Sequence, residues 1–236
     1  MIPRKAIIYD SSCPMCRWYT DEFVKAKLLD QHNRIAFAEL ENKGLVDKID
    51  LDRSRDEIPL VDLDGGETRY GIDSLVYLLA PRFPFIPRFL AIRPINWFFR
   101  HLYKFVSYNR RVMAPGRKVE QQYDCTPHFD WKYRWYYVLF SLSVGWFGLG
   151  TFCLAFLPNL LWLLIVLFFL LLLPYLHLEK KKAMEYMGQV STVWLLGGVL
   201  VLPALLVPAV AWVIGTIALG VMLWQSLRRF RLILEG

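Results

Sequence analysis

Two cysteines near the beginning of the chain have the types and the spacing that carry thiol chemistry. Cys13 and Cys16 are the ends of the tetrapeptide Cys13-Pro14-Met15-Cys16. A short apolar run of strand type, residues 6–9, precedes them, and apolar residues at helical spacing follow. We therefore predict a helix over about residues 13–30 that the pair opens directly after a strand, where two thiols can cycle between dithiol and disulfide.

The start of a helix favours a thiolate. Its unpaired N–H groups and the positive end of the helix dipole stabilise an anion on Cys13, so we expect a lowered pKa of Cys13 and a nucleophile at neutral pH. Pro14 suits the first turn because it has no N–H to leave unpaired. Cys16, one turn later and less exposed, is then expected to be the resolving thiol that attacks a mixed disulfide and releases the partner.

Two other interpretations of the pair stay open, a buried structural pair and half of a zinc site. Zinc takes four ligands, and the other Cys/His cluster of this half, Cys125 with His128, has unlike spacing and lies beside a strongly apolar region. Cys125 is interpreted either as a thiol that exchanges with Cys13 or as an unreactive cysteine. Cys153 lies in an apolar run and is expected to be a packing residue.

The segments after the pair predict the elements that position it. Strand candidates are residues 34–40, 58–63 and 67–70, with a turn at 64–66, and a helix follows through about residue 79. The order is strand, helix, strand, then a hairpin and a helix. This order predicts a small α/β sandwich.

Here the chain resembles the thioredoxin and glutaredoxin fold. The resemblance implies a cis proline just before the third strand, facing the redox cysteines, and Pro59 stands at that place. It also implies that the backbone of Ile58 is free to pair with an extended thiol substrate. Gly71 and Asp73 resemble the glutaredoxin segment that holds glutathione, and the alternative for them is a turn glycine and an N-cap aspartate.

The run from Asp10 to Cys16 resembles the signature of the DCC family of thiol-disulfide oxidoreductases, Asp-x-x-Cys-x-x-Cys. The resemblance covers about residues 4–118 and includes the stretch 103–111, which ends in Asn109-Arg110-Arg111. It implies a thiol-based reaction with Asp10, Cys13 and Cys16 as site residues. It also implies protein or low-molecular-weight thiols and disulfides as substrates, without a bound cofactor or metal, and with glutathione as a candidate co-substrate.

Asp10 has two interpretations. A carboxylate close to the pair could accept the proton of Cys16 as that thiol attacks. Alternatively, Asp10 caps the helix, a role that Ser11 and Ser12 suit better.

The composition divides the chain into a polar and an apolar half. It is 56% hydrophobic and 21% charged over 236 residues, which excludes intrinsic disorder, and only three acidic residues follow Arg134. Apolar runs over about residues 135–156, 160–178, 190–207 and 209–227 are long enough to cross a bilayer as helices. A soluble helical bundle and, for the last two runs, a re-entrant hairpin are the alternatives. We predict a thioredoxin-like domain (1–118), a juxtamembrane linker (119–133) and an all-α membrane domain (134–236).

Basic residues predict the orientation of these spans. They precede the first span, separate the second from the third and follow the fourth, so four crossings place all of them on one face, which is cytoplasmic by the positive-inside rule. No signal peptide is expected at the N-terminus. We expect a multi-pass protein of the plasma (inner) membrane with its N-terminal domain and C-terminus in the cytoplasm. The net charge of +7 comes without a dense basic stripe, so no nucleic-acid partner is expected.

The stretch between the two halves is rich in Pro, Phe, Arg and Trp. Residues 84–87 are interpreted as a bend, and residues 95–112 as an amphipathic helix with Arg110 and Arg111 on its polar face. This helix either lies on membrane lipid or covers one face of the sheet. The sequence thus predicts a membrane-anchored thiol-disulfide oxidoreductase. The alternative is a non-catalytic membrane assembly or binding module with structural or metal-holding cysteines.

Overall fold

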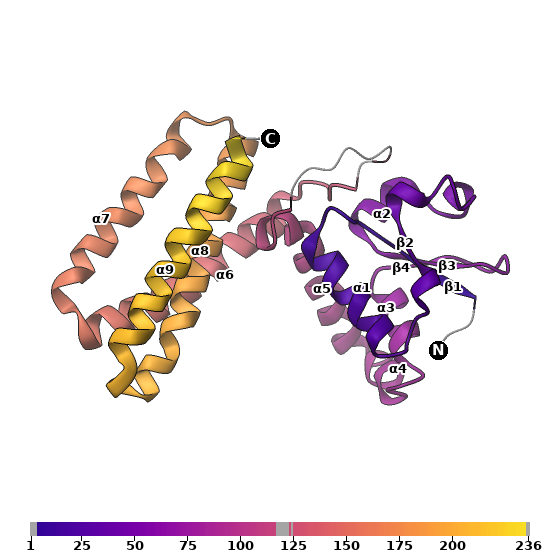
Figure 1. Ribbon diagram of the computed structural model, residues 1–236, viewed down its shortest axis with the longest axis horizontal. Coiled ribbons are helices and arrows are strands. Elements are labelled where there is room, and N and C mark those ends of the chain that lie inside the picture. Colours follow the sequence, from indigo (N-terminus) through magenta and orange to yellow (C-terminus); the bar gives the residue numbers. More distant parts are fainter. Residues whose placement is uncertain (1–3, 117–122, 124, 235–236) are drawn as a thin grey trace. The chain divides into compact units, whose positions relative to one another are not determined.

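The computed structural model describes residues 4–116, 123 and 125–234 (Figure 1). The chain divides into two compact units, an N-terminal unit of residues 1–130 and a C-terminal unit of residues 131–236. The division falls inside the stretch 119–133 that the composition predicts as a linker. Each unit is described by itself below.

The N-terminal unit contains a four-stranded mixed sheet of order β2-β1-β3-β4. Strand β1 runs parallel to β2, with Ile8 opposite Ile35, and antiparallel to β3, with Ala6 opposite Val61. The expected order of elements is confirmed, except that an unpredicted short helix (Leu51–Asp56) lies between β2 and β3. The strands are β1 (Lys5–Tyr9), β2 (Arg34–Ala36), β3 (Pro59–Asp62) and β4 (Arg69–Tyr70).

Strand alternation gives the sheet two buried faces. Ile7 and Leu60 pack with α1 (Pro14–Lys25) and α3 (Ile72–Leu79). Their neighbours on the strands pack on the other face, against the segment from β2 to α2 (Leu51–Asp56), and Figure 1 shows α2 across the sheet from α3. The α/β class predicted for this half is confirmed, and the site lies where β1 meets α1.

Local differences from the predicted elements have identifiable causes. Helix α1 ends at Lys25 rather than near residue 30, because Lys27 adopts a φ of +56°. The bend predicted at residues 84–87 is instead the start of α4 (Phe85–Leu90). Pro84 and Pro87 stand at the N-cap and in the first turn, where a missing N–H leaves no helical hydrogen bond unmade. Short 3-10 turns complete the unit at Gln31–Asn33, Phe37–Glu39 and Val46–Lys48.

Helix α5 (Arg93–Met113) belongs to the N-terminal unit, and its Tyr103 hydroxyl accepts a hydrogen bond from the N–H of Ile58, next to β3. A position on membrane lipid stays a prediction. The polar face expected for it is partly wrong. Arg110 is buried at 8% exposure, whereas Trp97 and Phe98 are 63% and 54% exposed. Arg110 tolerates burial because carbonyl oxygens from elsewhere in the chain accept its N–H groups.

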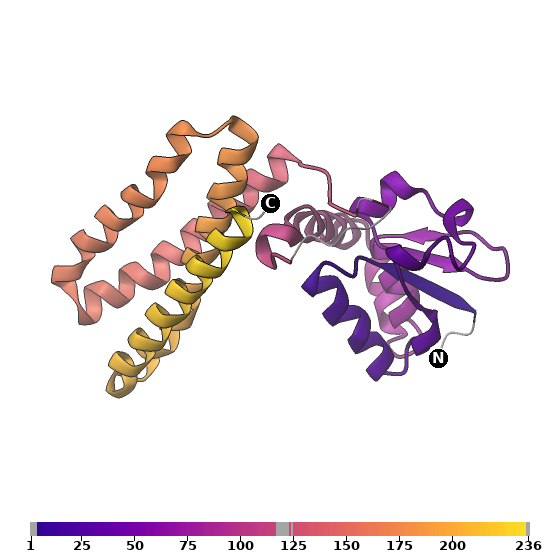
Figure 2. The same ribbon diagram turned by 45° about the horizontal axis from the view of Figure 1, so that its top comes forward.

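The C-terminal unit is all-helical and holds four candidate membrane-spanning helices, as predicted (Figure 2). The first and third begin earlier than expected, at Trp131 and Lys180, so Lys132 and Arg134 belong to the first helix. The helices are α6 (Trp131–Phe156), α7 (Leu161–Leu172), α8 (Lys180–Leu206) and α9 (Ala211–Leu234), with 3-10 turns at Pro158–Leu160, Leu173–His177 and Pro208–Val210.

Glycines bring α6 and α8 into close contact. A Cβ atom added at Gly145 would lie 2.7 Å from the Trp194 ring, and one at Gly148 would overlap the backbone of Gly198. Polar contacts gather at the other end of the bundle, where the Tyr137 and Thr192 hydroxyls are 2.7 Å apart. The backbones of α6 and α8 therefore approach closely at these glycines, beside a core of packed apolar side chains.

Candidate active site

Cys13 is the N-cap residue of α1 and stands at the end of the loop that follows β1. Its backbone is extended (φ −91°, ψ 114°), and its carbonyl accepts the first helical bond from the N–H of Arg17 at 3.1 Å. Pro14 occupies the first helical position, as the sequence predicts. Cys16 follows one turn later, so the structure places the two thiols side by side at the beginning of α1.

The pKa values of the two thiols move in opposite directions. Hydrogen bonding from the Cys16 thiol, helped by the Cys16 backbone N–H and the Arg110 charge, lowers the pKa of Cys13 to about 6, against the opposing effects of burial and of Asp10. The same hydrogen bond, together with burial, raises the pKa of Cys16 well above its usual range. Near neutral pH the pair therefore holds one thiolate on Cys13 and one proton on Cys16.

Cys13 is more deeply buried than expected. It is 0% exposed and Cys16 is 5% exposed, so the first thiol is not the more accessible of the two. Gly116, beyond α5, packs against the Ser12 carbonyl and Pro14; a Cβ atom added there would overlap the carbonyl oxygen and lie 3.0 Å from the proline ring. The chain after α5 thus covers the beginning of α1.

Asp10 is buried and organises the loop before Cys13. One carboxylate oxygen accepts hydrogen bonds from the Ser12 N–H (2.9 Å) and hydroxyl (2.6 Å), and the other pairs with the Arg111 guanidinium at 2.7 Å. Arg111 also donates to the Ser12 hydroxyl at 2.6 Å. The carboxylate therefore joins the loop to the end of α5. A role as proton acceptor for Cys16 stays a prediction.

Arg110 is a functional candidate to which the sequence analysis assigned no role. Its guanidinium donates to the carbonyl oxygens of Arg55 and Cys125, both at 2.7 Å, and its charge acts on Cys13 and Cys16. Burial lowers the pKa of Arg110, but the combined charges of Cys16, Cys13, Tyr19 and Asp10 outweigh this effect and raise it. The helical spacing of Tyr103, Ser107 and Arg110 could have indicated this role, because it places these polar residues on one stripe of α5.

Ile58 and Pro59 lie beside the site, but the cis bond implied at Pro59 is wrong. Every peptide bond among the described residues is trans, and Pro59 begins β3 opposite Tyr70. The Ile58 N–H donates to the Tyr103 hydroxyl at 2.9 Å, and its carbonyl accepts from Gly71 and Ser74, both at 3.0 Å. A substrate that pairs with this backbone would have to displace those partners.

Gly71 and Asp73 lie at the beginning of α3. Gly71 has a φ of +61°, and its N–H is already bonded to the Ile58 carbonyl. Asp73 is in the first turn and forms a two-bond ion pair with Arg100 at 2.8 and 3.0 Å. Their proposed contact with glutathione stays a prediction, and both have partners within the protein.

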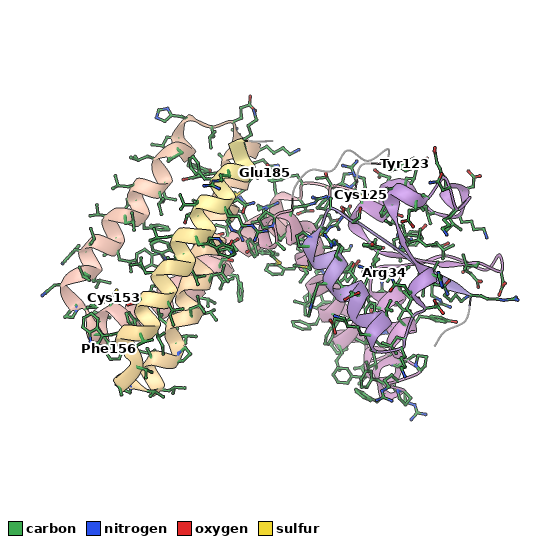
Figure 3. The ribbon with its side chains drawn as sticks, viewed as in Figure 1. Arg34, Tyr123, Cys125, Cys153, Phe156 and Glu185 are labelled. Atoms are coloured by element: carbon green, nitrogen blue, oxygen red, sulfur yellow. The ribbon has the colours of Figure 1, made fainter. Side chains whose placement is uncertain are left out.

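The remaining cysteines lie elsewhere. Cys125 is buried in the hydrophobic core on the α2 side of the sheet, and Cys153 lies within α6 (Figure 3). His128 contacts Asp56 at 2.8 Å and Asp52 at 3.3 Å. Across residues 4–116, 123 and 125–234, no three His, Cys, Asp or Glu side chains form a group that could hold a metal ion.

Comparison with known proteins supports the resemblance seen in the sequence. Residues 7–114 match the model of the family described as DCC1-like thiol-disulfide oxidoreductase. The matched region includes the cysteine pair, Asp10 and both arginines at the end of α5. Neither a curated protein nor a solved structure matches the chain.

Proposed function

We propose that the protein is a membrane-anchored thiol-disulfide oxidoreductase that uses Cys13 and Cys16 as a dithiol/disulfide pair on the cytoplasmic face. The observation that carries the proposal is the pairing at the start of α1, where hydrogen bonding leaves a thiolate on Cys13 and a proton on Cys16. The family match supports the same class of reaction.

The reaction follows from these protonation states. The Cys13 thiolate attacks a substrate disulfide, a Cys13–substrate bond forms, and one substrate sulfur leaves as a thiolate. Cys16 then loses its proton and attacks the Cys13 sulfur, which releases the second substrate thiol. The substrate is reduced by two electrons and the pair is oxidised. Asp10 is the proposed acceptor of the Cys16 proton, since both residues line one cavity.

The cytoplasmic orientation rests on where basic residues lie in the C-terminal unit. The Tyr137–Thr192 contact and the hydrogen bond from Arg229 to Gln189 join the beginnings of α6 and α8 to the end of α9. Lysines and arginines are concentrated at this end, which faces the cytoplasm by the positive-inside rule. Because the cytoplasm is reducing, disulfide reduction or redox sensing fits better than disulfide introduction.

Thiol trapping in cells tests the proposal. Cys16→Ser is expected to accumulate mixed disulfides through Cys13, Cys13→Ser is expected to form none, and Cys153→Ser serves as a cysteine control away from the site. Undiminished mixed disulfides in Cys13→Ser would overturn the mechanism. Stoichiometric zinc that only a chelator removes from the purified protein would favour the alternative of a binding module with metal-holding cysteines.

A further inference from the structure

A cavity of about 580 Å³ lies in the N-terminal unit and reaches Cys16, the second cysteine of the pair. Its volume is in the range of small-molecule binding sites, about 300–1,000 Å³. Side chains from β1, α1, α3, α4 and α5 line it, and Cys16 is part of the wall. Most of the lining is aliphatic or aromatic, as in Phe23, Leu75, Val76, Phe89 and Leu102.

The polar groups of the cavity include the active-site residues. Of the described residues that line it, only Asp10 and Arg110 are charged, and both act on the charge of Cys13. The Nε of Arg110 is buried and has no hydrogen-bond partner among the described residues. A buried donor without an acceptor is unfavourable, and a polar atom on a bound ligand would remove this cost.

The groups that would recognise glutathione are engaged within the protein. The Gly71 N–H is bonded to the Ile58 carbonyl, and the Asp73 carboxylate is paired with Arg100. Glutathione carries two carboxylates and an ammonium group, and placing such charges against apolar walls is costly. The cavity therefore favours a ligand with an apolar body over a charged tripeptide.

The apolar lining continues to the surface of the unit. Phe85, Phe89 and Leu102 line the cavity and are also substantially exposed. They come from α4 and α5, the two helices that cover this end of the domain. Apolar side chains therefore line a path along which an apolar ligand can pass from the surface to Cys16.

From these observations we infer that the substrate is a small disulfide carried on an apolar body, which the cavity holds with its sulfur atoms at the Cys16 end. The inference rests on the proposed function and names its substrate class. The pair, as one thiolate and one thiol, reduces the disulfide R–S–S–R. One S–S bond forms between Cys13 and Cys16, the substrate S–S bond breaks, and the products are one thiol RSH and one thiolate RS⁻.

The test uses the full chain in lipid nanodiscs, reduced beforehand, with di-n-butyl disulfide and bis(2-hydroxyethyl) disulfide as apolar and polar probes. We expect wild type to reduce the apolar probe at least about tenfold faster. Val76→Trp fills part of the cavity from α3 and is expected to lower the ratio of the two rates by about the same factor. Tyr77→Trp, on the same helix but outside the lining, is the matched control and is expected to retain the wild-type ratio.

Comparing the ratio of the two rates between wild type and a variant cancels the partition of the probes into lipid, because this partition is the same for every variant. Val76→Phe adds less volume and is expected to lower the ratio by an intermediate factor. An unchanged pH profile of Cys13 alkylation shows that a variant is folded. Equal wild-type rates for the two probes, or an unchanged ratio in folded Val76→Trp, would overturn the inference and leave the proposed function standing. Absence of exchange with either probe would overturn both.

Discussion

The interiors of the two units depend on different kinds of contact. In the N-terminal unit, Asp10 is buried beside Arg111, and Arg110 is held by two backbone carbonyls. In the C-terminal unit, α6 and α8 meet through glycines whose backbones touch. Lipid offers helices little hydrophobic driving force for association, so close packing decides their fit, whereas a water-soluble domain can use buried charges that have partners. Added volume should therefore destabilise the C-terminal unit, and altered charge should destabilise the N-terminal unit.

The largest effect is expected from added volume in α6. Gly148→Leu forces a side chain into the backbone of α8 and should lower the free energy of unfolding of the C-terminal unit by about 3 kcal/mol. Gly150→Leu is the matched control, since no atom lies within 4 Å of a Cβ added there. Unfolding by SDS in mixed micelles measures both variants. Equal stability of the two would refute the packing contrast.

A smaller effect is expected when a buried charge is removed from the N-terminal unit. Asp10→Asn leaves Arg111 without its ion pair and should lower the free energy of unfolding by about 2 kcal/mol. Asp64→Asn breaks the exposed pair with Arg4 and should cost less than about 0.5 kcal/mol. Pulsed alkylation of Cys125, which is buried in the hydrophobic core of this unit, follows its unfolding in urea.

Asp10→Asn also separates the two interpretations of that residue. If the carboxylate accepts the proton of Cys16, mixed disulfides on Cys13 will persist longer in this variant. Resolution of these mixed disulfides at the wild-type rate would show that Asp10 serves only to hold the loop in place.

The smallest effect is expected at Arg110, where charge acts at a distance. Arg110→Gln removes a cation that helps to lower the pKa of Cys13, so the alkylation rate of Cys13 at pH 6 should fall roughly fivefold. Wild-type alkylation should be half-maximal at a pH of about 6. Arg110→Lys retains the charge and should keep most of the rate, and a profile for Arg110→Gln that matches wild type would show that Arg110 only supports the fold.

The lowered pKa of Cys13 also sets how stability depends on pH. Because the folded value lies below the unfolded one, the thiolate stabilises the reduced, folded protein fully above the usual thiol pKa of 9.0. This contribution declines as the pH falls and is lost below about 6. Cys13→Ser should lack it.

Local patterns predicted the parts of the site that depend on neighbouring residues. The strand before Cys13 and the helix after it follow from apolar spacing within twenty residues, and similar local runs predicted the later strands. The burial of Arg110 depends on carbonyls of Arg55 and Cys125, which lie far away in the sequence. The exposure of Trp97 and the burial of Cys13 likewise depend on how the elements pack together, which a local pattern leaves undetermined.

Burial of the first thiol, between the Ser12 carbonyl and the Pro14 ring that Gly116 contacts, also separates this pair of sulfur atoms from solvent. Small hydrophilic thiols in solution meet a sulfur with no accessible surface, so we expect the pair to equilibrate slowly with the surrounding redox buffer even where this is thermodynamically favourable. If the pair works as proposed, its oxidation state reports encounters with its own substrates rather than the average potential of the solution.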